Sequence, residues 1–226
     1  MLLVFANASN KMLSPDASPI FSSPFLNISI TSFNVPNLTA SQIVLYSDIF
    51  ISFFNFNASF LLLKIFKEGD QNEISPSGRS LLFTALCNTK SKERYRIANF
   101  LINKGADVKA VTEDGISLFF PLFSYGWTDI VKTTILCKTL LEKGADITTI
   151  YKKEKTLAFK ELFNIGAPEM EMLPLYQLIL SQPGLPLLVK DKWGLTVIEF
   201  ARRSNRPIAV KMMEDYVKKY NLKEEN

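Results

Sequence analysis

The chain of 226 residues is long enough for one sizeable domain or two small ones. With 47% hydrophobic and 21% charged residues, it can bury a core, which excludes a wholly disordered tail. It contains no histidine and two cysteines, which excludes histidine-based nucleophilic catalysis, histidine metal ligands and a four-cysteine zinc site. The net charge of +4 is mild and no run of five like charges occurs, so we expect no nucleic-acid partner.

The extreme N-terminus, residues 1–8, has two open interpretations. Ala6-Asn7-Ala8 fits the small-residue pattern at which secretory signals are cleaved, but residues 1–8 lack the basic region and the apolar length of a complete signal. The segment is either an ordinary apolar N-terminus of a cytoplasmic protein, which we expect, or the remnant of a signal peptide that starts upstream. The second interpretation implies a periplasmic or secreted protein.

Residues 1–38 are predicted to form an irregular lead segment. They are rich in Ser and Asn, and prolines at four positions break any helix: Pro15, Pro19, Pro24 and Pro36. The remaining chain, residues 39–226, is predicted to form a separate domain.

Residues 43–63 are the most apolar stretch and have about the length of a membrane-spanning helix. Their polar residues recur at steps of four, three and four: Asp48, Ser52, Asn55 and Ser59. On a helix these form one polar stripe, which favours an amphipathic, partly buried helix. We therefore expect no membrane span.

From residue 69 onward a unit of about 39 residues recurs. Three tripeptides mark it: Gly105-Ala106-Asp107, Gly144-Ala145-Asp146 and Gly184-Leu185-Pro186. Ten residues after the opening glycine of each tripeptide a turn is predicted, at Gly115, Glu154 and Gly194. Further upstream, Gly78 follows Gly69 by nine residues. The pattern predicts a helix that ends at glycine, a short extended link, a turn and a new helix.

Each unit is predicted to hold two helices. The first follows the turn, whose glycine takes a positive φ, and is capped by a hydroxyl at Ser80, Ser117, Thr156 or Thr196. The second shows apolar stripes, with Pro174 and Pro207 at two of the helix starts. The stripes are Ile97, Ala98, Leu101 and Ile102; Ile130, Val131, Thr134 and Ile135; Leu175, Leu178 and Ile179; and Val210, Met213 and Val217.

These motifs resemble those of ankyrin-repeat proteins. The segments 125–132 and 140–146 are close to that family's second-helix pattern, and Lys190-Asp191-Lys192-Trp193-Gly194-Leu195-Thr196 matches its turn. The resemblance implies an all-α solenoid of about four to five stacked helix pairs in a divergent, bacterial member with lengthened repeats. The approximate units are 39–77, 78–114, 115–153, 154–193 and 194–226. The family's histidine is replaced by Phe83, Phe120, Phe159 and Glu199, so buried Phe contacts are expected in its place.

The resemblance also implies that a partner protein binds the concave surface formed by turn tips and first helices. The candidate partner-binding residues are Glu113, Asp114, Ile116, Tyr151, Lys152, Lys153, Lys155, Lys192, Trp193 and Leu195. The variable first-helix positions are Thr84, Pro121, Lys160 and Phe200. Aromatic side chains beside lysines suit an interface, with an acidic patch on the partner. Two alternatives stay open: Trp193 packs on the neighbouring repeat, or the lysines are plain solvated tips.

We therefore expect a non-catalytic, monomeric protein-interaction module that acts as an inhibitor, an immunity protein or a scaffold. The alternative is an extracytoplasmic accessory protein with a cleaved signal. An enzyme is not expected, and neither is a cofactor or a metal, because no convergent carboxylates or phosphate-binding glycine loop occurs. Cys87 and Cys137 are expected to be small buried hydrophobic residues.

Overall fold

The computed structural model describes residues 66–75, 78–124 and 129–223. The chain divides into two compact units, Met1–Pro36 and Asn37–Asn226, and all described residues belong to the second. The predicted lead segment, the signal remnant at 1–8 and the helix at 43–63 lie outside the described residues.

The described part is mostly helical, as expected for an all-α chain, with one short β hairpin. Its elements in chain order are the 3-10 helix η3 (Asp70–Asn72), α4 (Leu81–Leu86), α5 (Ser91–Asn103), α6 (Phe119–Ser124), α7 (Ile130–Glu142), β1 (Ile150–Tyr151), β2 (Thr156–Leu157), the 3-10 helix η4 (Ala158–Asn164), α8 (Glu169–Leu180), α9 (Val197–Arg203) and α10 (Pro207–Tyr220). None of these helices is both long and apolar enough to cross a lipid bilayer.

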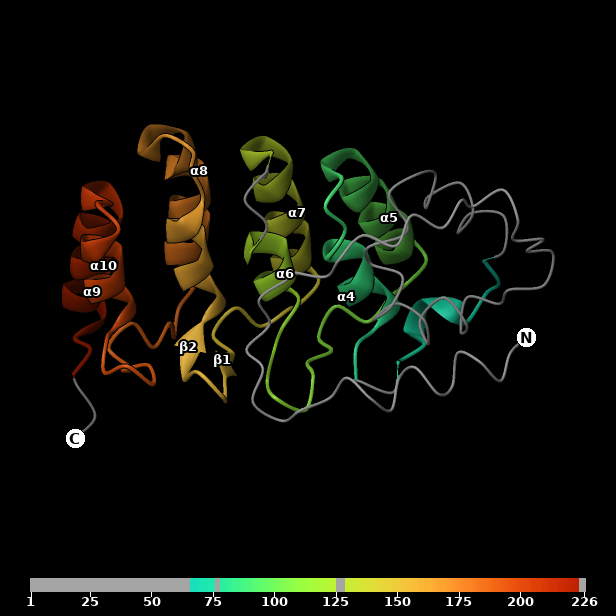
Figure 1. The fold of residues 1–226 in the computed structure, drawn as a ribbon, viewed down its shortest axis with the longest axis horizontal. Helices are drawn as coiled ribbons and strands as arrows, with labels where there is room; N and C mark the ends of the chain where they lie inside the picture. The colour runs from blue at the N-terminus through green and yellow to red at the C-terminus, as the bar shows by residue number, and fades with distance from the viewer. Residues whose placement is uncertain (1–65, 76–77, 125–128, 224–226) are drawn as a thin grey trace, which may run out of the picture. The chain divides into compact units, whose positions relative to one another are not determined.

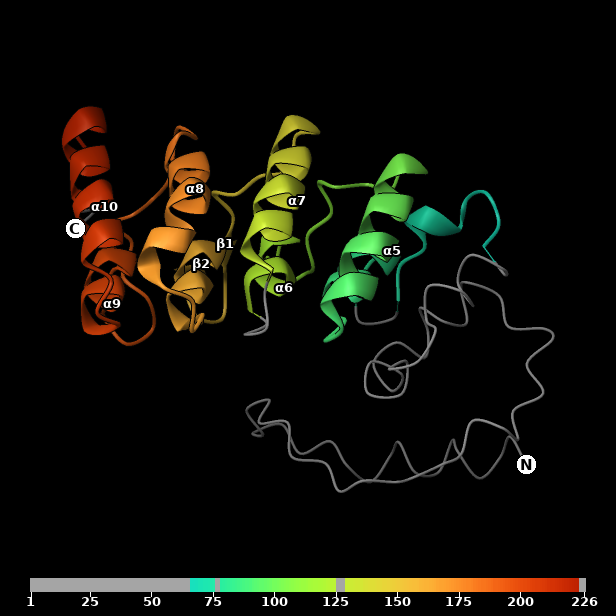
Figure 2. The same ribbon diagram turned by 90° about the horizontal axis from the view of Figure 1, so that it is seen from above.

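The helices of residues 78–223 form two neighbouring rows. The shorter helices α4, α6, η4 and α9 contact one another in chain order, and so do the longer helices α5, α7, α8 and α10. Figure 1 shows the helix pairs side by side, and Figure 2, seen from above, separates the row of longer helices from the row of shorter ones. Each row buries its inner face against the other, so one continuous core runs along the stack.

Aromatic side chains fill much of this core. Phe83, Phe120 and Phe159, which stand where the resemblance places histidine, are all buried. The Phe159 ring lies 5.2 Å from that of Phe163 and 6.0 Å from that of Tyr176, measured between ring centroids. The expected buried Phe contacts are therefore present, and they join a short helix to a long one by apolar packing.

Two of the four predicted hydroxyl caps are confirmed, and two are wrong. Ser80 Oγ accepts the Phe83 N–H at 3.1 Å, and Thr196 forms a reciprocal capping box with Glu199. Ser117 Oγ is buried without a hydrogen-bond partner in the described part of the chain, and Thr156 lies in β2. Thr156 is not a cap because the chain pairs Ile150–Tyr151 with Thr156–Leu157 as a hairpin before the next helix starts.

The turn of this unit also differs from the prediction. Lys155, rather than Glu154, takes the positive φ, at 52°. The glycine-like position has shifted because residues 152–155 close a hairpin. The helix that follows, η4, is of the tighter 3-10 type.

The predicted core face of α7 is wrong. Val131 and Ile135 are 70% and 60% exposed, and the buried side chains of α7 are Thr133, Leu136, Cys137 and Leu140. The helix is rotated so that Thr133 Oγ1 meets the Tyr95 hydroxyl of α5 at 2.6 Å inside the protein. A polar residue on the core face thus has a buried partner, which the apolar pattern alone does not reveal.

The predicted start of α8 is also wrong, whereas that of α10 is confirmed. Pro174 lies inside α8 rather than at its start, at an exposed position, and it cannot donate a hydrogen bond to the carbonyl group four residues earlier. The helix starts earlier, at Glu169, whose carboxylate accepts the Ile208 and Ala209 N–H groups of α10 at 3.1 and 2.9 Å. Pro207 occupies the first turn of α10, as expected.

Candidate protein-binding surface

The predicted partner-binding residues lie in three turns that follow one another along one edge of the helix rows (Figure 1). We call this edge the turn surface. It comprises Glu113, Asp114 and Ile116 in the first turn, Tyr151, Lys152, Lys153 and Lys155 in the second, and Lys192, Trp193 and Leu195 in the third.

The first and third turns close in the same way. Gly115 donates its N–H to Thr112 O at 2.8 Å, and Gly194 donates to Asp191 O at 2.9 Å. Both glycines have positive φ, 79° and 78°, as the sequence predicts. At Gly115 a side chain is also excluded by space, because a Cβ atom would lie 2.8 Å from the carbonyl oxygen of Ile150.

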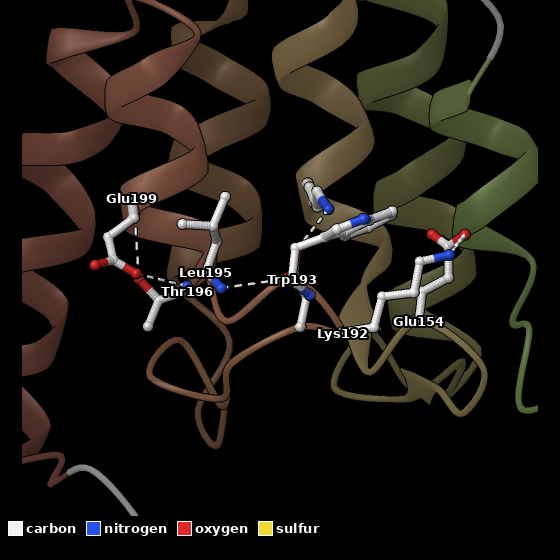
Figure 3. Close-up of polar contacts among 8 residues, drawn as sticks. Glu154, Lys192, Trp193, Leu195, Thr196 and Glu199 are labelled. Atoms are coloured by element: carbon white, nitrogen blue, oxygen red, sulfur yellow. Dashed lines mark hydrogen bonds and ion pairs between the residues drawn. The ribbon is translucent and has the colours of Figure 1, made fainter.

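Main-chain hydrogen bonds link each turn to the next. Lys152 donates its backbone N–H to Asp114 O at 2.9 Å, and Lys192 donates to Glu154 O, also at 2.9 Å. The lysine side chains repeat the connection. Lys152 Nζ donates to Glu113 O at 2.8 Å. Lys192 Nζ donates to Glu154 Oε1 at 3.1 Å (Figure 3). The structure therefore brings the predicted residues of all three turns into one row.

Trp193 is the exposed aromatic residue of the third turn. Its side chain is 59% exposed, although the Nζ atoms of Lys192 and Lys160 lie 4.2 and 4.7 Å from the centroid of its ring. The indole is therefore not buried against the neighbouring helix pair, which was the alternative interpretation. Ammonium groups at these distances from an indole are within the range of cation–π attraction.

A buried ion pair underlies this tryptophan. Lys160 Nζ lies 2.8 Å from Asp191 Oδ2, and the two side chains are only 8% and 3% exposed. The other carboxylate oxygen, Oδ1, accepts the N–H groups of Trp193 and Leu195 at 2.9 and 3.0 Å. Burial by itself raises the pKa of Asp191, but the Lys160 ammonium and these N–H groups outweigh it and hold the pKa below its ordinary value.

Tyr151 contributes less free surface than Trp193. Its ring packs edge-on against that of Phe120, with 5.7 Å between centroids, and the side chain is half-buried. Burial, with the nearby carboxylates of Glu154 and Asp114, raises the pKa of the Tyr151 hydroxyl. Ile116 and Leu195 are half-buried as well. Glu113, Asp114 and the predicted lysines, by contrast, are exposed: Lys152, Lys153, Lys155 and Lys192.

The variable first-helix positions do not form an open surface. Pro121 and Lys160 are buried, and Thr84 and Phe200 are half-buried. The candidate surface therefore consists of the turns rather than of turns and first helices together. Sequence reasoning missed the role of the Lys160–Asp191 pair, although a lysine within the apolar run from Leu157 to Phe163 needs a buried partner.

A separate hollow of about 570 Å³ lies between α8 and α10. Its lining is mostly apolar: Leu173, Gln177, Pro207, Ile208, Lys211, Met212 and Asp215. None of the predicted partner-binding residues lines it.

The cysteines and the acidic residues show no arrangement for metal binding in the described part of the chain. Cys87 and Cys137 are both buried, as expected. Burial raises the pKa of the Cys137 thiol to about 12.

The chain was compared with protein families, with curated proteins and with solved structures. A scan of protein families found none that matches the chain, and a search of curated proteins also found no match. Among solved structures, the chain is similar to a functionally unknown protein from Leptotrichia buccalis C-1013-b, with 47% sequence identity and a TM-score of 0.64. The match covers 82% of this chain and 96% of that protein. The chain therefore belongs to the same protein family as the functionally unknown protein of Leptotrichia buccalis.

Proposed function

We propose that the chain is a non-catalytic module that binds a partner protein through the turn surface, and that its helix pairs are lengthened ankyrin-type repeats. One observation carries the proposal. Backbone hydrogen bonds between successive turns hold charged and aromatic side chains from three turns in a single row.

The repeat assignment is supported by the regular alternation of short and long helices. Positive-φ glycines occur at both kinds of corner, after the long helices at Gly105, Gly144 and Gly184 and in the turns at Gly115 and Gly194. The spacing of 39 or 40 residues between corresponding glycines leaves room for the hairpin and the longer links. A stack of such units buries a continuous core, which one helix pair alone cannot do.

The binding assignment is supported by the composition and order of the turn surface. Exposed aromatic side chains that are already held in place lose little conformational entropy on binding, and they are common anchors of protein interfaces. Trp193 has this character. Three acidic residues have a structural role: Asp191 fixes a turn, Glu199 caps α9 and Glu169 holds the start of α10.

The experiment is affinity capture from cells of the source organism, with the tagged full-length chain as bait and mass spectrometry as the readout. The double variant Lys153→Glu/Trp193→Ala should lose a stoichiometric partner that the wild-type chain retains. The matched control Lys92→Glu/Val131→Ala changes an exposed lysine and an exposed apolar residue away from the turn surface, and it should retain the partner.

Circular dichroism must show that both variants melt close to the wild-type chain. Equal retention of the partner by both variants would refute the turn surface as the binding site. Loss from the control alone would place binding on the outer helices. The identity of the captured partner decides between inhibitor, immunity and scaffold roles.

A further inference from the structure

The third turn is built to hold one side chain in a fixed position. Asp191 accepts the Trp193 and Leu195 N–H groups, so the backbone on both sides of Gly194 is tied to one carboxylate. The carboxylate is itself fixed by Lys160, whose ammonium also lies 4.5 Å from the centre of the Phe200 ring. The Trp193 ring therefore rests on a buried, preorganised support.

This support also decides the charge around the indole. Asp191 of the third turn forms an ion pair with Lys160, and Glu154 of the second turn forms one with Lys192. Each of these two carboxylates therefore has a cationic partner. Five lysines of these turns are exposed: Lys152, Lys153, Lys155, Lys190 and Lys192. The surface around Trp193 is consequently cationic.

The first turn has the opposite charge. Glu113 and Asp114 are exposed there, and the second turn is hydrogen-bonded directly to them. The turn surface therefore changes sign along its length, from acidic at the first turn to cationic at the second and third. Complementary charge on a partner favours correct encounter, and a change of sign also fixes the direction in which the partner lies.

We propose that the partner presents an acidic segment that lies across the second and third turns and places one apolar side chain on the Trp193 indole. The inference rests on the proposed function, since it specifies the chemistry of the protein that the turn surface binds. Carboxylates face the lysines, and the apolar side chain covers the part of the indole that remains exposed. The acidic first turn repels such a segment, so the segment lies on the second and third turns only.

The test uses a synthetic peptide of alternating Glu and Leu with one central Phe. The full-length chain carries Trp127→Phe, so that Trp193 is its only tryptophan and its fluorescence reports binding. We expect the acidic peptide to change this fluorescence in a saturable way. The same peptide with Lys in place of Glu should not bind, and Trp193→Ala, studied by calorimetry, should abolish binding of the acidic peptide.

Matched charge reversals then locate the contact. Lys153→Glu/Lys155→Glu should weaken peptide binding about tenfold or more, because four units of charge change at the contact. Lys92→Glu/Lys223→Glu makes the same change in net charge at exposed positions outside the turn surface and should leave the affinity within about twofold. Raising the ionic strength should weaken binding to the wild-type surface and have much less effect on the Lys153→Glu/Lys155→Glu variant.

The inference is overturned if the acidic peptide fails to bind, if it binds both charge-reversed variants equally, or if the Lys peptide binds as well. Tighter binding of oligothymidylate than of the peptide would also overturn it and would assign the cationic turns to nucleic acid. A cellular partner could require Trp193 for binding and still bind the Lys153→Glu/Lys155→Glu variant. That result would support the proposed function and refute only the proposal that the partner's segment is acidic. Absence of both the cellular partner and peptide binding would refute both.

Discussion

Replacement of Lys160 by methionine isolates the charge of the buried ion pair beneath Trp193. Methionine keeps a long, flexible apolar stem in contact with Trp193 and Phe200 but leaves the Asp191 carboxylate buried without its cation. Removal of one partner of a buried pair costs about 3–5 kcal/mol of unfolding free energy. Asp191 retains the Trp193 and Leu195 N–H groups, so we expect the lower end, about 3 kcal/mol.

The loss should depend on pH in a defined direction. In the wild-type chain the folded pKa of Asp191 lies below its ordinary value of 3.8. Stability from this group is therefore fully present above pH 3.8 and is lost as the pH falls through the lower folded pKa. In Lys160→Met the dominant remaining influence is burial, which raises that pKa. The stability gap between the two proteins should be widest near neutral pH and should close in acid, once the buried carboxyl is protonated.

Urea unfolding followed by circular dichroism, at neutral pH and in a series down to acid pH, measures this gap. The double variant Lys160→Met/Asp191→Asn removes both charges while an amide oxygen still accepts the turn N–H groups. It should recover to within about 1 kcal/mol of wild type, because paired removal of buried charges is often neutral. A cost below about 1 kcal/mol for Lys160→Met alone, or a gap that widens in acid, would refute the reasoning.

Three further predictions concern other parts of the fold. Leu101→Ala, at a fully buried position of α5, should lower the free energy of unfolding by about 2–5 kcal/mol. Val131→Ala, at a 70% exposed position of α7, should lower it by less than about 0.5 kcal/mol. Urea unfolding of both variants tests which helix faces lie in the core. Thr196→Ala removes the capping box of α9 and should lower the unfolding free energy by about 1 kcal/mol in the same assay, and no change would mean that the cap has no energetic role. Iodoacetamide at mildly alkaline pH should leave Cys137 unlabelled in the native chain and label it in urea, because burial raises the pKa of its thiol to about 12. Labelling is detected by mass spectrometry, and rapid labelling of the native chain would contradict the burial of Cys137.

The order of short and long helices could be predicted from the sequence because glycines mark both ends of each unit. Gly115 and Gly194 have the expected positive φ, and the apolar stripe from Ile97 to Ile102 is buried as expected. These signals are local, since a turn conformation or a helix face depends on residues within one or two turns of chain. The placement of the three turns in one row follows from the same spacing.

The errors in the predicted fold arise where a contact distant in sequence decides the local structure. The face of α7 is set by the hydrogen bond between Thr133 and Tyr95, 38 residues apart, and apolar periodicity cannot show it. The start of α8 at Glu169 is tied to the N–H groups of α10, some 40 residues away. Trp193 could be named from sequence as a candidate anchor, but its support by Lys160 and Asp191, 31 residues apart, could not.

The hydrogen bonds between successive turns have a consequence for how this surface can evolve. Lys152 and Lys192 form these links through main-chain atoms, so any residue except proline can occupy either position and preserve the link. Side chains at the tips can therefore diverge between related proteins while the positions from which they project stay fixed. Homologues with the same backbone can thus acquire different partners by a few substitutions at the turns, without a new fold and with little loss of stability.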